Sequence, residues 1–174
     1  VYDRKRALAR FPEGLTILRG SLQAKAARAE VQLFSAEGDL RKLSLEGSVL
    51  LDGTLEDGSV VQGRAGTTEL EAIPEGRYRL TMEPSLETGW VGLRLADAAT
   101  GLREFEAWRL VGEGTRSEWE WLEGQGLACG EELQADADPR RAQAARMRVV
   151  FDAGQARTAR ASEDVRVETG AQWA

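Results

Sequence analysis

The chain has 174 residues, 42% of them hydrophobic, which is enough for one domain with a sizeable core. Its net charge of −6 disfavours a nucleic-acid partner, because phosphate binding requires clustered lysine and arginine. With no histidine and only one cysteine, Cys129, the composition excludes histidine metal sites, Ser-His-Asp triads and internal disulfides. No apolar run approaches the length of a membrane span. Because the chain opens at Val1 without a methionine, we expect that an upstream leader or anchor has been removed.

The first segments in chain order are an arm and a strand. Residues 1–14 are basic and then broken by Pro12 and Gly14, which predicts an N-terminal arm that could form an edge strand. Residues 15–18 follow as a short apolar strand before Arg19.

Residues 22–51 carry the clearest pattern in the chain. Apolar residues fall on every second position with polar residues between them, which is typical of half-buried antiparallel strands. Residues 36–39 supply the turn between the two strands. The segment therefore predicts a strand–turn–strand unit whose inward residues are Ala29, Val31, Leu33, Leu43, Leu45, Val49 and Leu51.

The same unit recurs near the C-terminus, where residues 133–137 correspond to residues 22–26. One strand–turn–strand unit cannot bury its own apolar face, so the repetition predicts stacked units that share one apolar interior. The second set of inward residues corresponds in order to Val31, Leu33, Gly38, Leu43, Leu45, Val49 and Leu51, and consists of Val149, Phe151, Gly154, Ala159, Ala161, Val165 and Val167.

Further strands are predicted around these units. The segment 102–112 changes phase, as a strand with a bulge would, and 138–146 could form one helical turn or a polar loop. We expect a single all-β domain over 1–174, with the arm at 1–14 and a tail at 168–174, built as a barrel, sandwich or jelly roll. The remaining predicted strands lie within 59–72, 78–82, 90–96, 117–122, 147–151 and 158–167.

The repeat resembles that of the OstA/LptA family of lipopolysaccharide-transport proteins, which includes LptA, LptC and the N-terminal domain of LptD. That family has a small apolar strand with Leu-x-Ala-x-x-Ala, a turn, and a strand ending in Gly-x-Val-x-Leu. The segment 56–65 is also similar, whereas 84–126 matches poorly and Glu163 replaces the glycine in the second copy. The matching residues are Leu22, Ala24, Ala26, Ala27, Ala29 and Val31, followed by Leu43, Leu45, Gly47, Val49 and Leu51.

The resemblance implies a twisted, partly open antiparallel β-jelly roll whose apolar groove shields the acyl chains of lipopolysaccharide or another envelope lipid in the periplasm. It also implies assembly with itself or with related envelope proteins by strand addition, and no cofactor, metal or enzymatic activity. Basic residues at the groove mouth, namely Arg19, Arg41 and Lys42, could meet lipid phosphates. The predicted groove lining consists of apolar residues that alternate along their strands and so share one face. It comprises Ala29, Val31, Leu33, Leu43, Leu45, Val49, Leu51, Leu80, Met82, Leu93, Leu95, Val149, Phe151, Val165 and Val167.

Two other functions remain open at this level. Glu118, Glu120 and Glu123 resemble in spacing the Glu-x-Asp-x-x-Glu signature of laminarinase-like retaining glycosidases, a β-jelly-roll family. That resemblance implies a glycan-active or glycan-binding protein; the alternative is a strand with Trp119 and Trp121 in the core and a charged outer face. A structural envelope module without cargo is the third function. An acidic cluster that could hold calcium, or form a solvated loop, consists of Glu131, Glu132, Asp136 and Asp138.

Overall fold

The computed structural model describes residues 2–3, 7–19, 21–34, 38–54, 60–87, 89–97, 101–115, 119–133, 140–152 and 155–169. Within these ranges the chain is almost entirely antiparallel strand, with one 3-10 turn at Pro74–Gly76. The all-β prediction is therefore confirmed. The strands are β1 (Tyr2–Asp3), β2 (Leu8–Phe11), β3 (Leu15–Arg19), β4 (Leu22–Ala26), β5 (Arg28–Leu33), β6 (Leu40–Thr54), β7 (Val60–Ile73), β8 (Arg77–Glu83), β9 (Val91–Asp97), β10 (Gly101–Gly114), β11 (Trp119–Leu133), β12 (Arg140–Asp152), β13 (Gln155–Ser162) and β14 (Arg166–Thr169).

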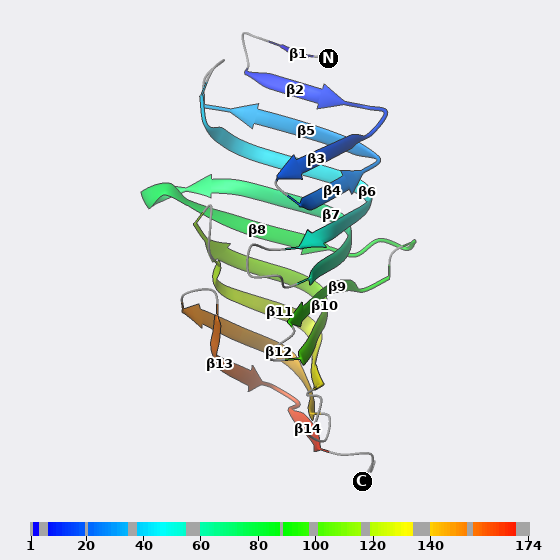
Figure 1. Ribbon diagram of the computed structural model, residues 1–174, viewed down its shortest axis with the longest axis vertical. Helices are drawn as coiled ribbons and strands as arrows, with labels where there is room; N and C mark the ends of the chain where they lie inside the picture. The colour runs from blue at the N-terminus through cyan, green and yellow to red at the C-terminus, as the bar shows by residue number, and fades with distance from the viewer. Residues whose placement is uncertain are drawn as a thin grey trace.

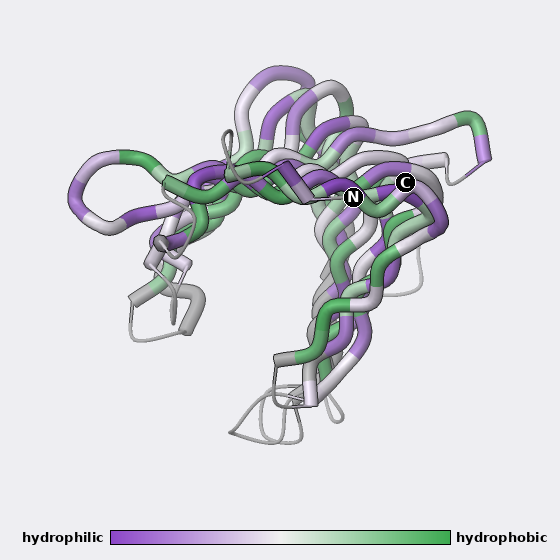
Figure 2. The backbone as a smooth tube through the Cα atoms, turned by 90° about the horizontal axis from the view of Figure 1, so that it is seen from above, coloured by the Kyte–Doolittle hydropathy of each residue, from purple (hydrophilic) through white to green (hydrophobic). Residues whose placement is uncertain are grey.

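All these strands belong to one sheet that folds over into two walls (Figure 1). Five long strands run through both walls, with one part of each strand in the first wall and the other part in the second. They are β6, β7, β10, β11 and β12. The first wall adds β1, β2, β5, β8 and β13 to these halves, and the second wall adds β3, β4, β9 and β14. Seen along the long axis, the walls meet at one corner and then diverge (Figure 2).

The corner arises where the strands bend out of register. Between Glu46 and Val49 the pairing of β6 with β7 slips, and there Gly47 and Ser48 have φ values of 77° and 52°. The pairing of β11 with β12 slips at Gly126 and Leu127, whose φ values are 69° and 72°. Such left-handed residues inside a ladder redirect the strand, so the sheet turns from one wall into the other.

The predicted repeat of strand–turn–strand units is present in the backbone. Val31 pairs with Leu43 in the first unit, and Val149 pairs with Ala159 at the corresponding place in the second. The corners also correspond, because Ala27 N–H donates to Gly47 O at 3.1 Å and Ala145 N–H donates to Glu163 O at 2.9 Å. Glu163 and Asp164 adopt φ values of 65° and 53°, so the second copy keeps the corner without the glycine. Residues 133–137 correspond to residues 22–26 in the sequence, but residues 134–137 lie outside the described part of the chain.

The local structure agrees with some of the sequence predictions and differs from others. The phase change in 102–112 is a bulge as predicted, because the register of β10 with β11 shifts between Ala107 and Arg109. The helical turn or loop predicted for 138–146 is wrong, since β12 begins at Arg140. Alanine at the inward positions Ala142 and Ala144 weakens the strand signal there. The arm at 1–14 contains β1 and β2, and β14 continues two residues into the predicted tail.

The core lies in the corner, where the two walls face each other. Val49 and Ala65 have no exposed surface, and Met82, Val91 and Leu110 are each 1% exposed. These residues come from β6, β7, β8, β10 and the start of β9, so the core runs along the corner across much of the sheet. A smaller cluster of Ala107, Ala128 and Met147 continues it toward the C-terminal edge.

Candidate functional site: the apolar inner face of the folded sheet

The inner face of the first wall is built from two rows of residues that lie in register across the strands. Neither row contains a charged residue, because every second position on each strand is apolar, glycine or threonine. The row nearest the corner is Phe11, Ala29, Leu45, Thr68, Met82, Leu110, Gly124, Met147 and Ala161. The next row outward is Ala9, Val31, Leu43, Leu70, Leu80, Gly112, Leu122, Val149 and Ala159.

The second wall has matching rows that face the first. Beside the corner lie the pair Val49–Ala65 and the run Val91, Ala107, Ala128 and Ala144. The next row outward is also free of charge, so two apolar faces oppose each other along the whole sheet. It consists of Ile17, Ala24, Leu51, Gly63, Leu93, Phe105, Gly130, Ala142 and Val167.

On β6 and β8, burial on the inner face decreases with distance from the corner, whereas Leu122 in the outward row of β11 is only 4% exposed. Leu45 is buried, whereas Leu43, two residues farther along the same face of β6, is half-buried. Met82 and Leu80 show the same step on β8. The walls therefore pack together at the corner and leave part of the apolar surface of their outer rows exposed, in keeping with the divergence seen in Figure 2.

The predicted groove residues fall into three groups by burial. Ala29, Leu45, Val49 and Met82 are buried, and Val165 and Val167 are 48% and 68% exposed. The two valines are exposed because they follow the last corner at the edge of the described sheet, where no further strand covers them. The side chain of Leu95 lies outside the described part of the structure. The half-buried group is Val31, Leu33, Leu43, Leu51, Leu80, Leu93, Val149 and Phe151.

Sequence reasoning missed several inner-face residues in the tryptophan-rich segment 84–126. Leu110 and Leu122 are nearly fully buried and belong to the same rows as the predicted residues. The sequence signal for these residues was the alternation of apolar residues before and after Ala107. The alternation changes phase at Ala107, and the bulge in β10 accommodates this change. Parity alone would also have found Leu70, since it pairs with Leu43 and Leu80.

Two glycines on the inner face lie where a larger side chain would not fit, and Gly124 is close to the opposite wall. A Cβ on Gly124 would lie 2.7 Å from Phe105 Cζ and 2.9 Å from the Cβ atoms of Ala107 and Ala128. Such distances are shorter than van der Waals contact, so only glycine fits between the walls there. At Gly112 a Cβ would lie 2.4 Å from Cδ2 of Leu122, its partner on the neighbouring strand of the same wall, so this glycine leaves room for the leucine.

One polar group interrupts the inner rows. Thr68 is 6% exposed and lies in register between Leu45 and Met82. Its hydroxyl oxygen is buried and has no hydrogen-bond partner within the described part of the chain. A buried hydroxyl without a partner destabilises the folded state, so this position is not optimised for stability.

The outer face of the first wall carries charged residues that form ion pairs. Lys42 Nζ lies 2.8 Å from Glu69 Oε1, and this hydrogen bond raises the pKa of Lys42 above 10.5. Of the predicted mouth residues, Lys42 therefore lies on the outer face in an ion pair, and Arg41 is exposed. The side chain of Arg19 is not among those described. Arg10–Glu30 at 2.9 Å and Arg79–Glu113 at 2.7 Å continue the pattern along the wall.

Two of the three carboxylates of the glycosidase-like motif, Glu120 and Glu123, lie in ion pairs on this outer face. Arg77 Nη2 is 2.5 Å from Glu120 Oε2 and 2.9 Å from Glu113 Oε2. Glu123 accepts a hydrogen bond from Gln125 Nε2 at 2.8 Å and pairs with Arg146. Glu118 lies outside the described residues, as do Asp136 and Asp138 of the acidic cluster. Among the described residues, no group of three or more acidic, cysteine or histidine side chains could hold a metal.

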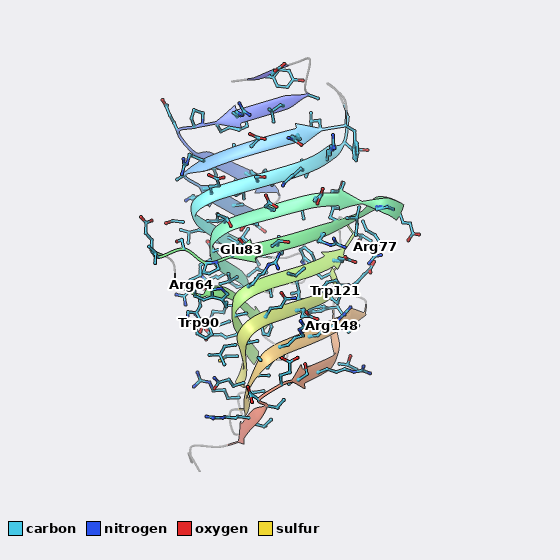
Figure 3. The ribbon with its side chains drawn as sticks, turned by 180° about the vertical axis from the view of Figure 1, so that it is seen from behind. Arg64, Arg77, Glu83, Trp90, Trp121 and Arg148 are labelled. Carbon is cyan, nitrogen blue, oxygen red and sulfur yellow. The ribbon has the colours of Figure 1, made fainter. Side chains whose placement is uncertain are left out.

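A bulge separates the two tryptophans of this segment. Trp121 pairs with Glu113 and Trp119 with Gly114, so the register shifts by one residue between them. Trp121 therefore lies on the charged outer face, where the guanidinium of Arg148 is 4.3 Å from its ring centroid. Figure 3 shows Arg77, Trp121 and Arg148 following one another along the first wall. The expectation that both tryptophans share the core is wrong for Trp121.

A shallow hollow of about 270 Å³ lies on the outer face of the first wall near the corner. Glu69 and Glu83 line it, but Lys42 and Arg109 already neutralise these carboxylates at 2.8 and 3.3 Å. The hollow is therefore a polar surface feature, and the inner face is the better candidate for a functional site.

Comparison with known proteins adds no family assignment: no family model matches the chain, and no curated protein sequence matches it significantly. The likeness to the OstA/LptA family therefore remains a prediction. The described residues contain no helix long and apolar enough to cross a membrane.

Proposed function

We propose that this protein is a periplasmic carrier that binds an envelope lipid, such as lipopolysaccharide, between the two walls of its sheet. The observation that carries the proposal is the set of uncharged rows on both inner faces, which extend from β2 and β3 to β13 and β14. An acyl chain lying along these rows would remove apolar surface from water on both sides. The sequence resemblance to a family of lipopolysaccharide-transport proteins supports the same function.

The outer rows supply the binding surface. Leu43, Leu70 and Leu80 on the first wall and Leu51 and Leu93 on the second are half-buried in the free protein. Covering such surface with an alkyl chain contributes about 0.8 kcal/mol for each buried CH₂ group. A chain that occupied several neighbouring strands would therefore bind without any specific polar contact.

The ends of the sheet support assembly by strand addition. In the described part of the sheet, β1 and β3 at one end and β13 and β14 at the other each pair with a single neighbour. An edge strand with unpaired N–H and C=O groups can accept a strand from another molecule. End-to-end pairing would place the apolar rows of successive molecules in line, so that one lipid path crosses several of them.

A structural envelope module without cargo is the second candidate. It is favoured by the corner itself, where protein side chains leave Val49 and Ala65 completely enclosed. Under this alternative the outer rows stabilise the fold and the edges carry the whole function.

Native mass spectrometry of two matched variants tests the carrier. Leu80 and Thr81 are neighbours on β8 with opposite orientations, so Leu80→Gln alters the inner face and Thr81→Gln the outer face. We expect co-purifying or added lipid on the wild type and on Thr81→Gln, and a loss of about tenfold in lipid binding for Leu80→Gln. Equal lipid binding by both folded variants would refute the proposal. A wild type that never carries lipid but forms end-to-end oligomers would favour the structural module.

A further inference from the structure

The outward row of the first wall changes its burial along the length of the sheet. On β2, β5, β6, β7 and β8 every residue of this row is half-buried. These residues are Ala9, Val31, Leu43, Leu70 and Leu80. On the next two strands, β10 and β11, Gly112 and Leu122 are buried, and Leu122 is only 4% exposed. The row is therefore covered at β10 and β11, whereas it is partly open on the strands before them.

Phe105 fills the space between the walls at this point. It lies on β10 in the outward row of the second wall, where it pairs with Leu93 of β9 and Gly130 of β11. A Cβ on Gly124, which belongs to the first wall, would lie 2.7 Å from Phe105 Cζ. The tip of the ring therefore reaches across to the row nearest the corner on the opposite wall. Phe105 also packs against both buried clusters of the core, so its ring forms a barrier across the inner face.

Met147 makes a similar contact in the opposite direction. It belongs to the row nearest the corner on the first wall and is 5% exposed. A Cβ on Gly130, in the outward row of the second wall, would lie 3.0 Å from Met147 Sδ. At Gly63, by contrast, the atoms nearest such a Cβ belong to Leu51 and Gly92, on neighbouring strands of the same wall. A glycine of the outward row therefore meets the other wall beside the barrier but not on β7.

The part of the inner face before the barrier is the one that we call the N-terminal section. In the first wall it runs over the five strands β2, β5, β6, β7 and β8, and in the second wall over β3, β4, β6, β7 and β9. Neighbouring strands lie about 4.8 Å apart, so five strands extend over about 20 Å. A fully extended alkyl chain of about 16 carbons has this length. Because its rows are also uncharged and partly open, the section suits one acyl chain.

We propose that Phe105 ends the lipid site, so that one acyl chain lies across the strands of the N-terminal section and stops at the Phe105 ring. The inference rests on the carrier function proposed above and adds the position and the maximum length of the bound chain. A longer chain projects past the N-terminal edge of the sheet, where it gains no further apolar contact within the molecule. Phe105 is half-buried, and transfer of a chain beyond β12 requires its ring to turn away from Gly124.

Affinity as a function of chain length tests the barrier. Saturated fatty acids of about 10 to about 22 carbons are compared by their displacement of a fluorescent fatty acid from the protein. We expect the affinity of the wild type to rise about fourfold for each added CH₂ group up to about 16 carbons and then to level off. Removing the ring in Phe105→Ala should move this limit to chains longer by about four carbons, the spacing of one strand. The shift in the limit, and not the absolute affinity, identifies the barrier.

Two matched variants test the position of the site without removing a core residue. Ala24 on β4 and Ala142 on β12 are both half-buried in the outward row of the second wall, one before the barrier and one beyond it. Ala24→Phe places a ring inside the N-terminal section and should lower the affinity for a chain of about 16 carbons by about tenfold. Ala142→Phe adds the same ring beyond Phe105 and should bind like the wild type. Circular dichroism and thermal melting establish that both variants are folded.

The outcomes separate this inference from the carrier function. The same chain-length limit in the wild type and in Phe105→Ala, or no limit in the wild type, would overturn the barrier. So would an equal loss of affinity in Ala24→Phe and Ala142→Phe, which decides the matter even if Phe105→Ala does not fold. In each of these cases the wild type still binds fatty acid, so the carrier function stands. A wild type that bound no fatty acid of any length would instead contradict the carrier function and, with it, this inference.

Discussion

The corner and the outer rows of the inner face are made of the same residue types, yet they differ in what surrounds them. At the corner, Val49 and Ala65 are packed on all sides by the two walls. Farther out, Leu43 and Leu80 point in the same direction from the same strands but keep part of their surface exposed. The difference comes from the divergence of the walls and not from composition.

This comparison separates stability from binding on one continuous surface. Apolar burial stabilises the fold in proportion to the area removed from water, so the corner carries most of the stability. The outer rows contribute less in the free protein and retain surface that a ligand could cover. Incomplete burial in an apolar row is therefore the property that the proposed lipid-binding residues share.

The largest expected effect is a charge placed in the corner. Val49→Asp buries a carboxylate with no compensating partner in the apolar cluster and should destabilise the fold by at least about 4 kcal/mol. Circular dichroism should show an unfolded or molten protein. Ser48→Asn, one residue away, exposed and at a left-handed φ, is the control and should melt close to the wild type. A folded Val49→Asp would show that the corner is not the stability centre.

A second comparison uses two leucines on one strand. Leu45→Ala should cost about 3 kcal/mol in urea denaturation because the residue is buried, whereas Leu43→Ala should cost about 1 kcal/mol. For lipid binding the order should reverse, with Leu43→Ala the more damaging of the two. Equal losses of stability would mean that the outer row is as well packed as the corner, which would weaken the distinction between them.

The closeness of the walls toward the C-terminal end can be tested with one methyl group. Gly124→Ala would bring a Cβ to 2.7–2.9 Å from Phe105, Ala107 and Ala128, which belong to the other wall and have little room to move. Overpacking of this kind should cost about 2 kcal/mol. The control is Gly92→Ala, where the nearest atom is 3.3 Å away on the flexible side chain of Arg64, and little change is expected. If the two variants melted alike, the walls would be farther apart than described.

Removing the buried hydroxyl of Thr68 should have a smaller effect in the opposite direction. Thr68→Val keeps the shape of the side chain and eliminates an oxygen that has no hydrogen-bond partner among the described residues. We expect a gain of about 1 kcal/mol in the free energy of unfolding. A loss of stability would reveal a hydrogen bond to water or to the backbone at this point. Thr68→Ser, which retains the hydroxyl, is the control and should not gain.

Much of this arrangement could be predicted from the sequence, because the alternation of inward apolar and outward polar residues is visible along each strand. The pairs Val31–Leu43 and Val149–Ala159 follow directly from aligning the two repeats. Parity also placed Leu80 and Met82 on the inner face. What it could not predict is the split of that face into a filled corner and a half-exposed outer part, since burial depends on the distance between walls.

The failures have local physical causes. Residues 138–146 read as a helical turn or loop because alanine and arginine favour helix, although Ala144 is held in the sheet by β11. Trp121 was expected in the core, but Leu122 takes the inward position beside it, so Trp121 lies on the outer face against Arg148. Each error arises where tertiary pairing overrides a local preference.

The smallest effect concerns the outer face and separates it from the inner rows by its response to pH. The hydrogen bond from Lys42 to Glu69 raises the pKa of Lys42 in the folded state. The pair should therefore stabilise the fold fully below pH 10.5, the ordinary pKa of lysine, and lose this contribution as the pH rises through the raised pKa of the folded state.

Lys42→Gln should lower the free energy of unfolding by about 0.5 kcal/mol at neutral pH, as is usual for an exposed ion pair. The difference from the wild type should vanish when urea denaturation is repeated at strongly alkaline pH. Arg41→Gln, next to it on β6, should keep a constant difference over this range because arginine stays protonated. A Lys42→Gln difference that persisted at alkaline pH would assign the lysine's contribution to the packing of its aliphatic stem.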